Sequence, residues 1–459
     1  MPSPEHSRKL ITPQFNAMAG LIKESYDRKS LSDIEKLLGR HETLGFKIKP
    51  NGLYAALTTD KIDAVSGYTY TWVRDSVMVS HFQLETGRPD IAAKTMQALE
   101  TFFEKHKSRF DNIISGKASK EDVMERPHIR FNGDTLDEVR QKWAHAENDA
   151  LGYALWLTFK LANEGHLQMS SANRGLWARF PAYLEAIAYW NDPDSGHWEE
   201  ARKVESSSIG PVVAGLEQMK TYMQKHPEAE FSYDGKPATV AQLDGLIAQG
   251  RKQLDAFLPW ETPGVRKADA ATLFLIYPLN VVGEKQADAI LDTVLTDLMG
   301  DYGIKRYLGD SYWGADYKTL MAEADLTADF SDNMEERDKK LIPNTEAQWN
   351  LFDPMVSVVY GRRYLKSGDP QDLEKQTYFF NRSLTQLTGD NAPVGPGKCA
   401  EAHYMEDSKT GAYVPNDNMP LAWTQANLGT ALDYMKRSLE KQAAGGVRTS
   451  PKPPHKPQR

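Results

Sequence analysis

Residues 150–161 read ALGYALWLTFKL, and this stretch decides the fold class. Its large apolar side chains point in nearly every direction around a helix of 3.6 residues per turn: Leu151, Tyr153, Leu155, Trp156, Leu157 and Phe159. A helix that is apolar nearly all round must be buried on all sides, because any face left in water exposes hydrophobic surface. We therefore expect this helix to lie in the interior of the protein.

Helical spacing of apolar residues recurs on both sides of this stretch. Residues 90–105 carry them on one face, and eight more segments have a helical pattern: 76–85, 176–190, 209–225, 240–257, 285–298, 346–365, 373–387 and 421–439. Helix stops are well marked, since Thr86-Gly87 comes ahead of Pro89 and Glu164-Gly165 follows the buried helix. Alternating strand patterns are scarce, and the short ones around residues 47 and 304–307 resemble loop segments. The sequence therefore predicts an all-α protein.

The composition is that of a soluble globular protein. Of the 459 residues, 40% are hydrophobic and 26% are charged, which is ordinary for this class. The net charge of −8 argues against a nucleic-acid or anionic-membrane partner, because neither surface attracts a negative protein. Cys399 is the single cysteine, so an internal disulfide and a cysteine-rich zinc site are both excluded. The chain has no phosphate-binding glycine motif and no metal-ligand cluster, so we expect no cofactor and no metal.

The two ends of the chain differ from its body. Residues 1–21 contain no uninterrupted apolar run, and no stretch of about 18 apolar residues is present to span a bilayer. We therefore expect no signal peptide, no membrane span and a cytoplasmic location, although export without a cleavable signal would leave the same sequence. Residues 443–459 are basic and proline-rich, so we expect a disordered tail after a single domain over residues 1–440.

The distinctive residues gather in five loops, most of which come shortly before a predicted helix: 71–75, 143–149, 197–200, 306–313 and 401–418. Neighbouring loops are roughly 50–100 residues apart, which is one or two helix pairs of ordinary length. A ring of helix pairs would bring these loops to one end, where helix N-termini favour negative groups and hydrogen-bond acceptors. The spacing therefore predicts an α/α toroid with a single site built from loops.

These loops hold groups that are able to bind and cleave a sugar. Tryptophan and tyrosine rings cover the C–H faces of a sugar, while carboxylates and arginines bind its hydroxyls. Cleavage of a glycosidic bond needs one carboxyl group that stays protonated and another that stays ionised. Glu199 follows Trp198 and precedes Glu200, so an indole and a like charge are both expected to raise its pKa. Acid pairs on loops are usually solvated, so these residues alone do not identify a site.

One eight-residue stretch resembles a family signature. Residues 68–75 read YTYTWVRD, which is similar to the Tyr-x-Tyr-x-Trp-x-Arg-Asp signature of family 15 glycoside hydrolases, the glucoamylases. Five further elements of that family follow in the same order: Arg130-Phe131-Asn132, Trp143 with Asp149 six residues on, Trp198-Glu199-Glu200, Arg306-Tyr307 with Asp310 and Tyr312, and Glu401 with the later Pro420-Leu421-Ala422-Trp423. Together the six motifs extend over about residues 50 to 440.

The resemblance implies an (α/α)6 barrel and an inverting mechanism with two carboxyl groups. Glu199 would be the general acid that protonates the glycosidic oxygen, and Glu401 the general base that activates a water. Other roles are implied for nine residues: Tyr68 in placing the water, Arg74, Asp75, Trp198, Glu200 and Arg306 in binding the terminal glucose, and Trp72, Trp143 and Trp423 in walling the site. Asp75 follows its expected partner Arg74 at a helix N-terminus, so we expect it to stay ionised. The implied partner is an α-glucan or oligosaccharide.

The sequence departs from the glucoamylase pattern in two loops. Leu308 and Gly309 stand where the family has Pro-Glu, so the family's contacts to the second sugar do not carry over. The residues around Glu401 read AEAHY and lack the Gln that often follows the base in fungal glucoamylases. That stretch, together with residues 198–210 and 302–310, is more similar to the phosphorylase kinase α and β subunits, whose glucoamylase-like domain is regulatory.

Two classes of function follow from the resemblance. One is an enzyme, an exo-acting α-glucosidase that releases β-glucose from non-reducing ends, with a trehalase as a variant on the same scaffold. The other is a glucan-sensing module without turnover. We expect the enzyme, because the kinase subunits continue far beyond this domain whereas this chain ends about 20 residues after its last predicted helix. Bond specificity, natural substrate, chain-length preference and oligomeric state are not indicated by the sequence.

Overall fold

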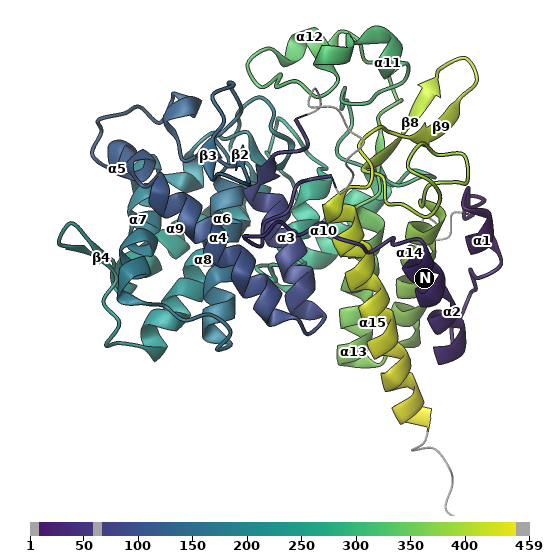
Figure 1. The fold of residues 1–459 in the computed structure, drawn as a ribbon, viewed down its shortest axis with the longest axis horizontal. Helices are drawn as coiled ribbons and strands as arrows, with labels where there is room; N and C mark the ends of the chain where they lie inside the picture. Colours follow the sequence, from purple (N-terminus) through teal and green to yellow (C-terminus); the bar gives the residue numbers. More distant parts are fainter. Residues whose placement is uncertain (1–8, 58–66, 447–459) are drawn as a thin grey trace, which may run out of the picture.

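The structure, a computed structural model, describes residues 9–57 and 67–446, which form mainly helices in two layers (Figure 1). The inner layer is a ring of six elements: α3 (Val73–Glu85), α6 (Asn148–Asn163), α8 (Ser206–Lys225), η6 (Ala270–Leu275), α13 (Phe352–Ser367) and α15 (Ala422–Gly446). α6 packs between α3 and α8, and α15 closes the ring by packing on α13 and α3. η6 is a short 3₁₀-helix, and its Phe274 lies 6.0 Å from Phe352 of α13, ring centre to ring centre. The all-α class predicted from the sequence is confirmed.

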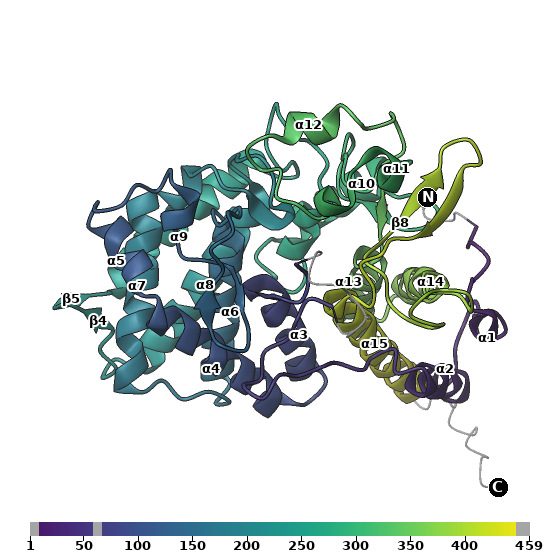
Figure 2. The same ribbon diagram turned by 45° about the horizontal axis from the view of Figure 1, so that its top comes forward.

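Six more helices form an outer layer around this ring: α2 (Arg28–Arg40), α4 (Pro89–Lys105), α7 (Ser171–Ile187), α9 (Val240–Phe257), α10 (Glu284–Asp297) and α14 (Pro370–Thr385). Most of them pack on a neighbour in the chain, as α4 does on α3, α9 on α8, α10 on η6 and α14 on α13. Figure 2 shows α13, α14 and α15 side by side, with α2 against α15. The apolar spacing of the sequence does not predict α2. It begins with a capping box in which Asp27 and Ser30 satisfy each other's backbone N–H groups.

The helix predicted from residues 150–161 is α6, and it is buried as expected. Each of its six large apolar side chains is at most 3% exposed. α6 and α8 approach closely because Gly152 has no side chain: a Cβ there would lie 2.4 Å from the backbone nitrogen of Val212. The predicted stops are confirmed as well, since Gly87 and Gly165 follow the ends of α3 and α6 with φ of 78° and 82°.

Short antiparallel strands join the loops at one end of the barrel. β1 (Thr71–Trp72) pairs with β2 (Arg130–Asn132), which pairs with β3 (Asp137–Glu138). A second sheet has the strand order β6 (Ile304–Lys305), β7 (Gln348–Trp349), β8 (Ala402–Asp407) and β9 (Ala412–Pro415). The helix predicted to start at residue 346 therefore begins only at Phe352, because β7 pairs with β6 and β8. A separate hairpin joins β4 (Ser232–Tyr233) to β5 (Lys236–Pro237).

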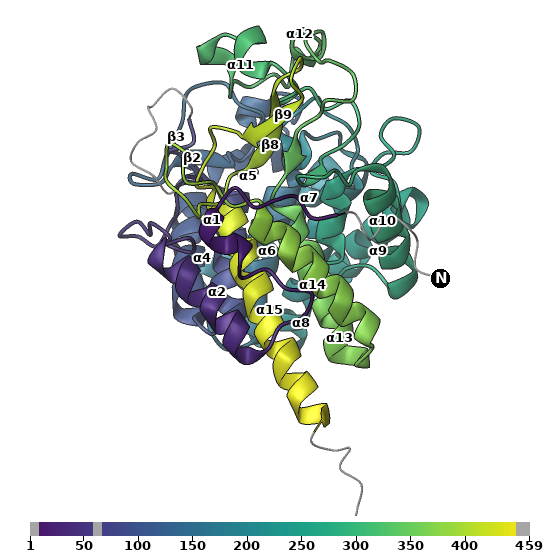
Figure 3. The same cartoon turned by 90° about the vertical axis from the view of Figure 1, so that its right-hand side faces the viewer.

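The chain between β6 and β7 lies over the same end of the barrel. Its part from residue 317 to 345, called the cover segment below, contains α11 (Tyr317–Leu320), the 3₁₀-turn η7 (Glu323–Asp325) and α12 (Met334–Asp338). Figure 3 shows α11 and α12 above the helical layers, at the end where β8 and β9 lie. Two short helices, α1 (Asn16–Ala19) and α5 (Ser108–Ile114), complete the α-helices of the described residues.

The ends of the described chain bear on two expectations. α15 continues to Gly446, past residue 443, at which the disordered tail is expected to begin. The remainder of that tail, residues 447–459, lies outside the described residues. Residues 1–8, which belong to the segment in which no signal peptide is expected, also lie outside them. Within residues 9–57 and 67–446, none of the helices combines the length and apolar character that crossing a bilayer requires.

Candidate active site

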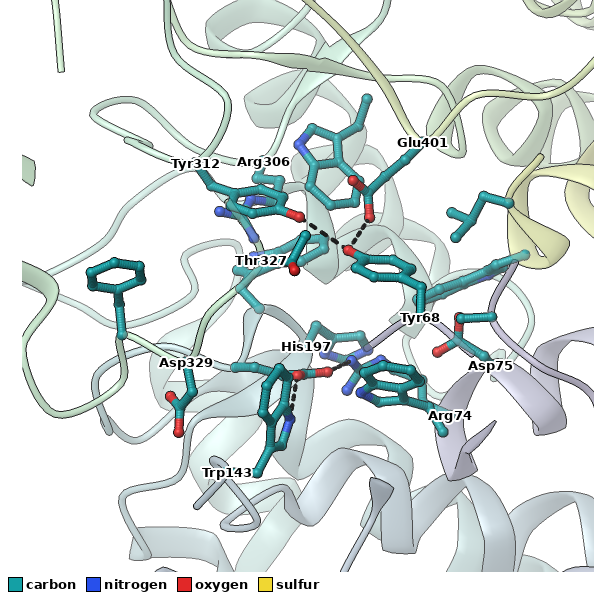
Figure 4. A pocket seen from close by; sticks show the side chains of 18 of the residues that line it. Tyr68, Arg74, Asp75, Trp143, His197, Arg306, Tyr312, Thr327, Asp329 and Glu401 are labelled. Carbon is teal, nitrogen blue, oxygen red and sulfur yellow. Dashed lines mark hydrogen bonds and ion pairs between the residues drawn. The ribbon is translucent and has the colours of Figure 1, made fainter. Parts of the chain in front are cut away.

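A cavity lies where the loops at the end of the barrel meet the cover segment. Ten of the eleven residues predicted for the site line it: Tyr68, Trp72, Arg74, Asp75, Trp143, Trp198, Glu199, Arg306, Glu401 and Trp423. Figure 4 shows Glu401 and Tyr68 in the upper part of this cavity and Trp143 and Arg74 in the lower part. The loops therefore converge at one site, as their spacing in the sequence predicts.

Glu199 is held by two donors, one on each carboxyl oxygen. The indole Nε1 of Trp143 donates to Oε2 at 2.6 Å, and Nη2 of Arg74 donates to Oε1 at 2.8 Å. Glu199 follows the 3₁₀-turn η5 (Gly196–Trp198) and has φ of 57°, in the left-handed region. Burial raises the pKa of Glu199, while Arg74 and Trp143 act against that shift. The carboxyl therefore keeps its proton to a higher pH than a solvated glutamate does.

Arg74 is the centre of a buried charge network. Its Nη1 donates to Oε2 of Glu147 at 2.8 Å and to Oδ2 of Asp149 at 3.2 Å, while Nη2 binds Glu199. The guanidinium is 4% exposed, and the side chains of Glu147 and Asp149 are fully buried. Its three ion-pair partners among the described residues therefore come from other loops, whereas the sequence suggested the adjacent Asp75.

Asp75 lies in the first turn of α3 and lines the cavity. Burial raises its pKa to about 7, Arg74 acts against this shift, and Glu199 and Glu401 add to it. The expectation that Asp75 stays ionised is therefore wrong near neutral pH, where about half of the carboxyls carry a proton. The helix N-terminus and Arg74 favour the carboxylate of Asp75, but the loss of water around it on burial outweighs them.

Glu401 is 3% exposed and is surrounded by neutral donors. The hydroxyl of Tyr68 donates to Oε1 at 2.9 Å, and the side-chain amides of Asn416 and Asn418 donate to Oε2 at 2.8 and 2.6 Å. Burial raises the pKa of Glu401 above its usual value, although these three donors and Arg306 act against the shift. Hydrogen bonds to the charged form favour a carboxylate, so these surroundings suit a group that acts in its ionised state.

Glu200 is not among the residues that line the cavity, so its contact with the sugar stays a prediction. Its carboxylate is 1% exposed and accepts from Arg306 at 2.9 Å, from Arg337 at 2.7 Å and from the Tyr307 hydroxyl at 2.7 Å. Burial acts to raise the pKa of Glu200, but Arg306 and Arg337 outweigh it and hold the pKa well below its usual range. Glu200 therefore fixes Arg306 and Arg337, and both of these arginines line the cavity.

The tryptophans wall the cavity and belong to the hydrophobic core at the same time. Five of them line it and are 5–7% exposed: Trp72, Trp143, Trp198, Trp349 and Trp423. Trp198 donates its Nε1 to Asp269 at 2.9 Å, so the indole that binds Glu199 is that of Trp143. The two neighbours expected to raise the pKa of Glu199 are thus both engaged elsewhere, and burial raises it instead.

Part of the cover segment also lines the cavity, which the sequence did not predict. Four consecutive residues contribute to the wall: Thr327, Ala328, Asp329 and Phe330. Lys142, next to Trp143 in the chain, forms ion pairs of 2.8 Å with Asp329 and of 2.8 Å with Asp332. No motif marks this segment, so residue type and spacing gave no signal for it.

Other missed residues lie inside loops that the sequence had already singled out: Glu147, His197, Asn416 and Asn418. His197 lines the cavity, and its Nε2 lies 2.8 Å from the hydroxyl of Tyr153. Burial lowers the pKa of His197 well below its usual range, so the imidazole is neutral. These four residues could have been predicted only from their positions beside the motifs in those loops.

Comparison with known proteins identifies the family. Residues 47–340 match the sequence profile described as Glycosyl hydrolases family 15. The chain belongs to this family. The resemblance inferred from the six motifs is therefore confirmed. Glu401 and the motif around Trp423 lie beyond the matched residues.

Two curated relatives are regulatory subunits of a kinase. The chain is 26% identical over 255 residues to the phosphorylase b kinase regulatory subunit alpha, skeletal muscle isoform, of Oryctolagus cuniculus, which is 53% of this chain and 19% of that protein. It is 24% identical over 237 residues to the probable subunit alpha of Caenorhabditis elegans, which is 50% of this chain and 18% of that protein. The chain thus spans about a fifth of the length of these relatives.

Solved structures with a similar fold are glycosidases. A wild-type glycosidase has a TM-score of 0.61 at 17% identity, with 90% of this chain and 99% of that chain covered. A glucoamylase from Saccharomycopsis fibuligera has a TM-score of 0.55 at 13% identity, with 91% and 97% covered. These likenesses, together with the two layers of helices, confirm the expected (α/α)6 barrel.

Proposed function

We propose that this family 15 member is an inverting, exo-acting α-glucosidase that releases β-glucose from the non-reducing ends of α-glucans or malto-oligosaccharides. In the proposed step, Glu199 gives its proton to the glycosidic oxygen as the bond between that oxygen and C1 breaks. A water attacks C1 from the opposite face of the ring and passes a proton to Glu401. Proton exchange with solvent then restores both carboxyl groups.

The observation that carries this proposal is a pair of buried carboxyl groups that line one cavity in different surroundings. Glu199 shares the guanidinium of Arg74 with two other carboxyl groups. Glu401 instead accepts three hydrogen bonds from uncharged donors. Burial raises the pKa of both groups, but a shared guanidinium acts on Glu199 whereas mainly neutral donors act on Glu401. Two carboxyls in different surroundings are what an acid and a base require, which supports the assignment of Glu199 as acid and Glu401 as base.

The exo-acting part of the proposal is supported by the inner end of the cavity. Arg74 and Asp75 belong to the first turn of α3, and the buried carboxyls of Glu147 and Asp149 lie behind the Arg74 guanidinium. Arg306 is backed in the same way by Glu200. A cavity closed behind charged groups suits the hydroxyls of a terminal sugar, because each hydroxyl can exchange hydrogen bonds with a fixed partner.

Two alternatives make different predictions. The similarity to kinase regulatory subunits over about half the chain favours a glucan-sensing module as the second candidate, and a trehalase uses the same scaffold. The experiment measures glucose release from maltose, isomaltose, trehalose and glycogen, together with calorimetric binding of maltose. We expect glucose from at least one α-glucan. Micromolar binding of maltose with no glucose released from any of the four sugars would overturn the enzyme assignment, and release from trehalose alone would identify the trehalase.

A further inference from the structure

Glu147 belongs to the charge network of the site but does not line the cavity. Its side chain is fully buried, directly before α6, and its Oε2 accepts from Arg74 at 2.8 Å. Its other oxygen, Oε1, has no hydrogen-bond partner among the described residues. Arg74 is therefore the group that stabilises a charge on Glu147, and no sugar in the cavity is in a position to take its place.

The network contains more carboxyl groups than cations. Glu147, Asp149 and Glu199 all bind the single guanidinium of Arg74, at 2.8, 3.2 and 2.8 Å. His197 lies 3.5 Å from Asp149, but burial lowers the pKa of this imidazole and keeps it uncharged. Three ionised carboxylates on one guanidinium would leave two uncompensated negative charges out of water, which is strongly unfavourable. The three carboxyl groups together therefore retain protons that solvated carboxyl groups would have lost at the same pH.

The guanidinium of Arg74 by itself would lower the pKa of Glu199 and so oppose its role as general acid. Arg74 donates directly to Glu199, and an adjacent cation stabilises the carboxylate and so promotes loss of the proton. Two further charged groups act on Glu199: Arg130, whose guanidinium lies 3.8 Å above the Trp143 ring, acts in the same direction as Arg74, and Asp75 acts against them. A second carboxylate on Arg74 offsets the effect of the guanidinium.

We propose that Glu147 is a positioning residue for the acid, and that it shares the charge of Arg74 so that Glu199 keeps its proton at the pH of catalysis. The role depends on the proposed function of Glu199 as general acid. Burial raises the pKa of Glu147 well above its usual range, with Glu199 adding to the shift and Arg74 acting against it, so Glu147 and Glu199 compete for one guanidinium and for the protons that the network retains.

The test replaces the charge and keeps the shape. Glu147→Gln retains an oxygen that accepts from Arg74 but removes the negative charge, so Glu199 should lose its proton more easily. We expect the basic limb of the kcat/KM profile against pH to move to lower pH by about one unit or more. Glu147→Asp keeps the charge and should leave that limb near its wild-type position. Glu100→Gln is the matched control, because Glu100 is a partly buried carboxyl that binds Trp177 away from the cavity.

A second readout does not require turnover. Carbon NMR of protein labelled with ¹³C at glutamate carboxyls follows Glu199 directly, with its resonance assigned by its loss in Glu199→Gln. Because Asp149 stays on Arg74 in both proteins, the loss of Glu147 alone predicts that Glu199 titrates at lower pH in Glu147→Gln than in the wild type. A Glu199 titration at the same pH in both proteins, or an equal acid shift of the basic limb in Glu147→Gln and Glu147→Asp, overturns the proposal. A wild type that releases no glucose contradicts the proposed function alone, because the NMR titration still decides the coupling.

Discussion

Tyr68→Phe tests the proposed base by removing one hydrogen bond without changing the shape of the ring. The Tyr68 hydroxyl donates to Oε1 of Glu401 at 2.9 Å, while the two asparagine amides both bind Oε2. A hydrogen bond to a charged group contributes about 1.5–3 kcal/mol, and about 1.4 kcal/mol corresponds to one pKa unit or tenfold in rate. Loss of the donor should therefore raise the pKa of Glu401 by about one to two units.

The sign of the pH effect follows from the proposed role of Glu401. The base acts only when ionised, so a higher pKa moves the acidic limb of the kcat/KM profile to higher pH. At a pH below that limb, kcat/KM should fall by about ten- to a hundredfold. The assay is initial-rate glucose release from maltose across the pH range. Tyr26→Phe is the matched control, because its buried hydroxyl donates to Asn381 at 2.6 Å and lies outside the cavity. An acidic limb that stays at the wild-type pH in Tyr68→Phe would refute this account of the base.

Three other substitutions test separate parts of the molecule. Glu199→Gln should lower kcat by about 10²–10⁴ and remove the basic limb, because only a protonated acid donates; a pH profile that keeps this limb contradicts the assignment. Asp75→Ala should lower kcat/KM at least tenfold. Calorimetry should show that maltose binding by the wild type weakens as the pH falls through about 7, and that this dependence is lost in Asp75→Ala. Gly152→Ala should lower the free energy of unfolding by about 1–3 kcal/mol in denaturant titrations, because its Cβ would lie 2.4 Å from the Val212 nitrogen. Gly245→Ala in α9 has open space around the new Cβ and should cause no such loss.

The helical layers could be predicted from local sequence. α6 is apolar on nearly every side, and the glycines after α3 and α6 mark where those helices end. The start of α13 could not be predicted in this way, because residues 348–349 have apolar neighbours at helical spacing but pair with β6 and β8. Strand pairing depends on segments distant in the chain, and the apolar period of one segment carries no record of them.

The site could be predicted as a set of loops but not as a set of contacts. The order of six motifs located ten residues that line the cavity. It did not reveal that Glu200 binds Arg306, because these two residues are 106 positions apart in the chain. The pairing of Arg74 with Glu147 joins residues 73 positions apart, so adjacency suggested Asp75 instead. The cover segment was missed because nothing in its composition distinguishes a cavity wall from a surface loop.

The anomeric form of the first glucose released tests the central claim most directly. Inverting hydrolysis requires that water attack C1 on the face opposite the leaving oxygen, with Glu401 as its base. Proton NMR of the reaction mixture during the first minutes, before mutarotation equilibrates the anomers, distinguishes the two products by their H1 resonances. The account predicts β-glucose as the initial product from an α-linked substrate. α-Glucose as the initial product would contradict it, because retention requires a carboxylate that attacks C1 itself.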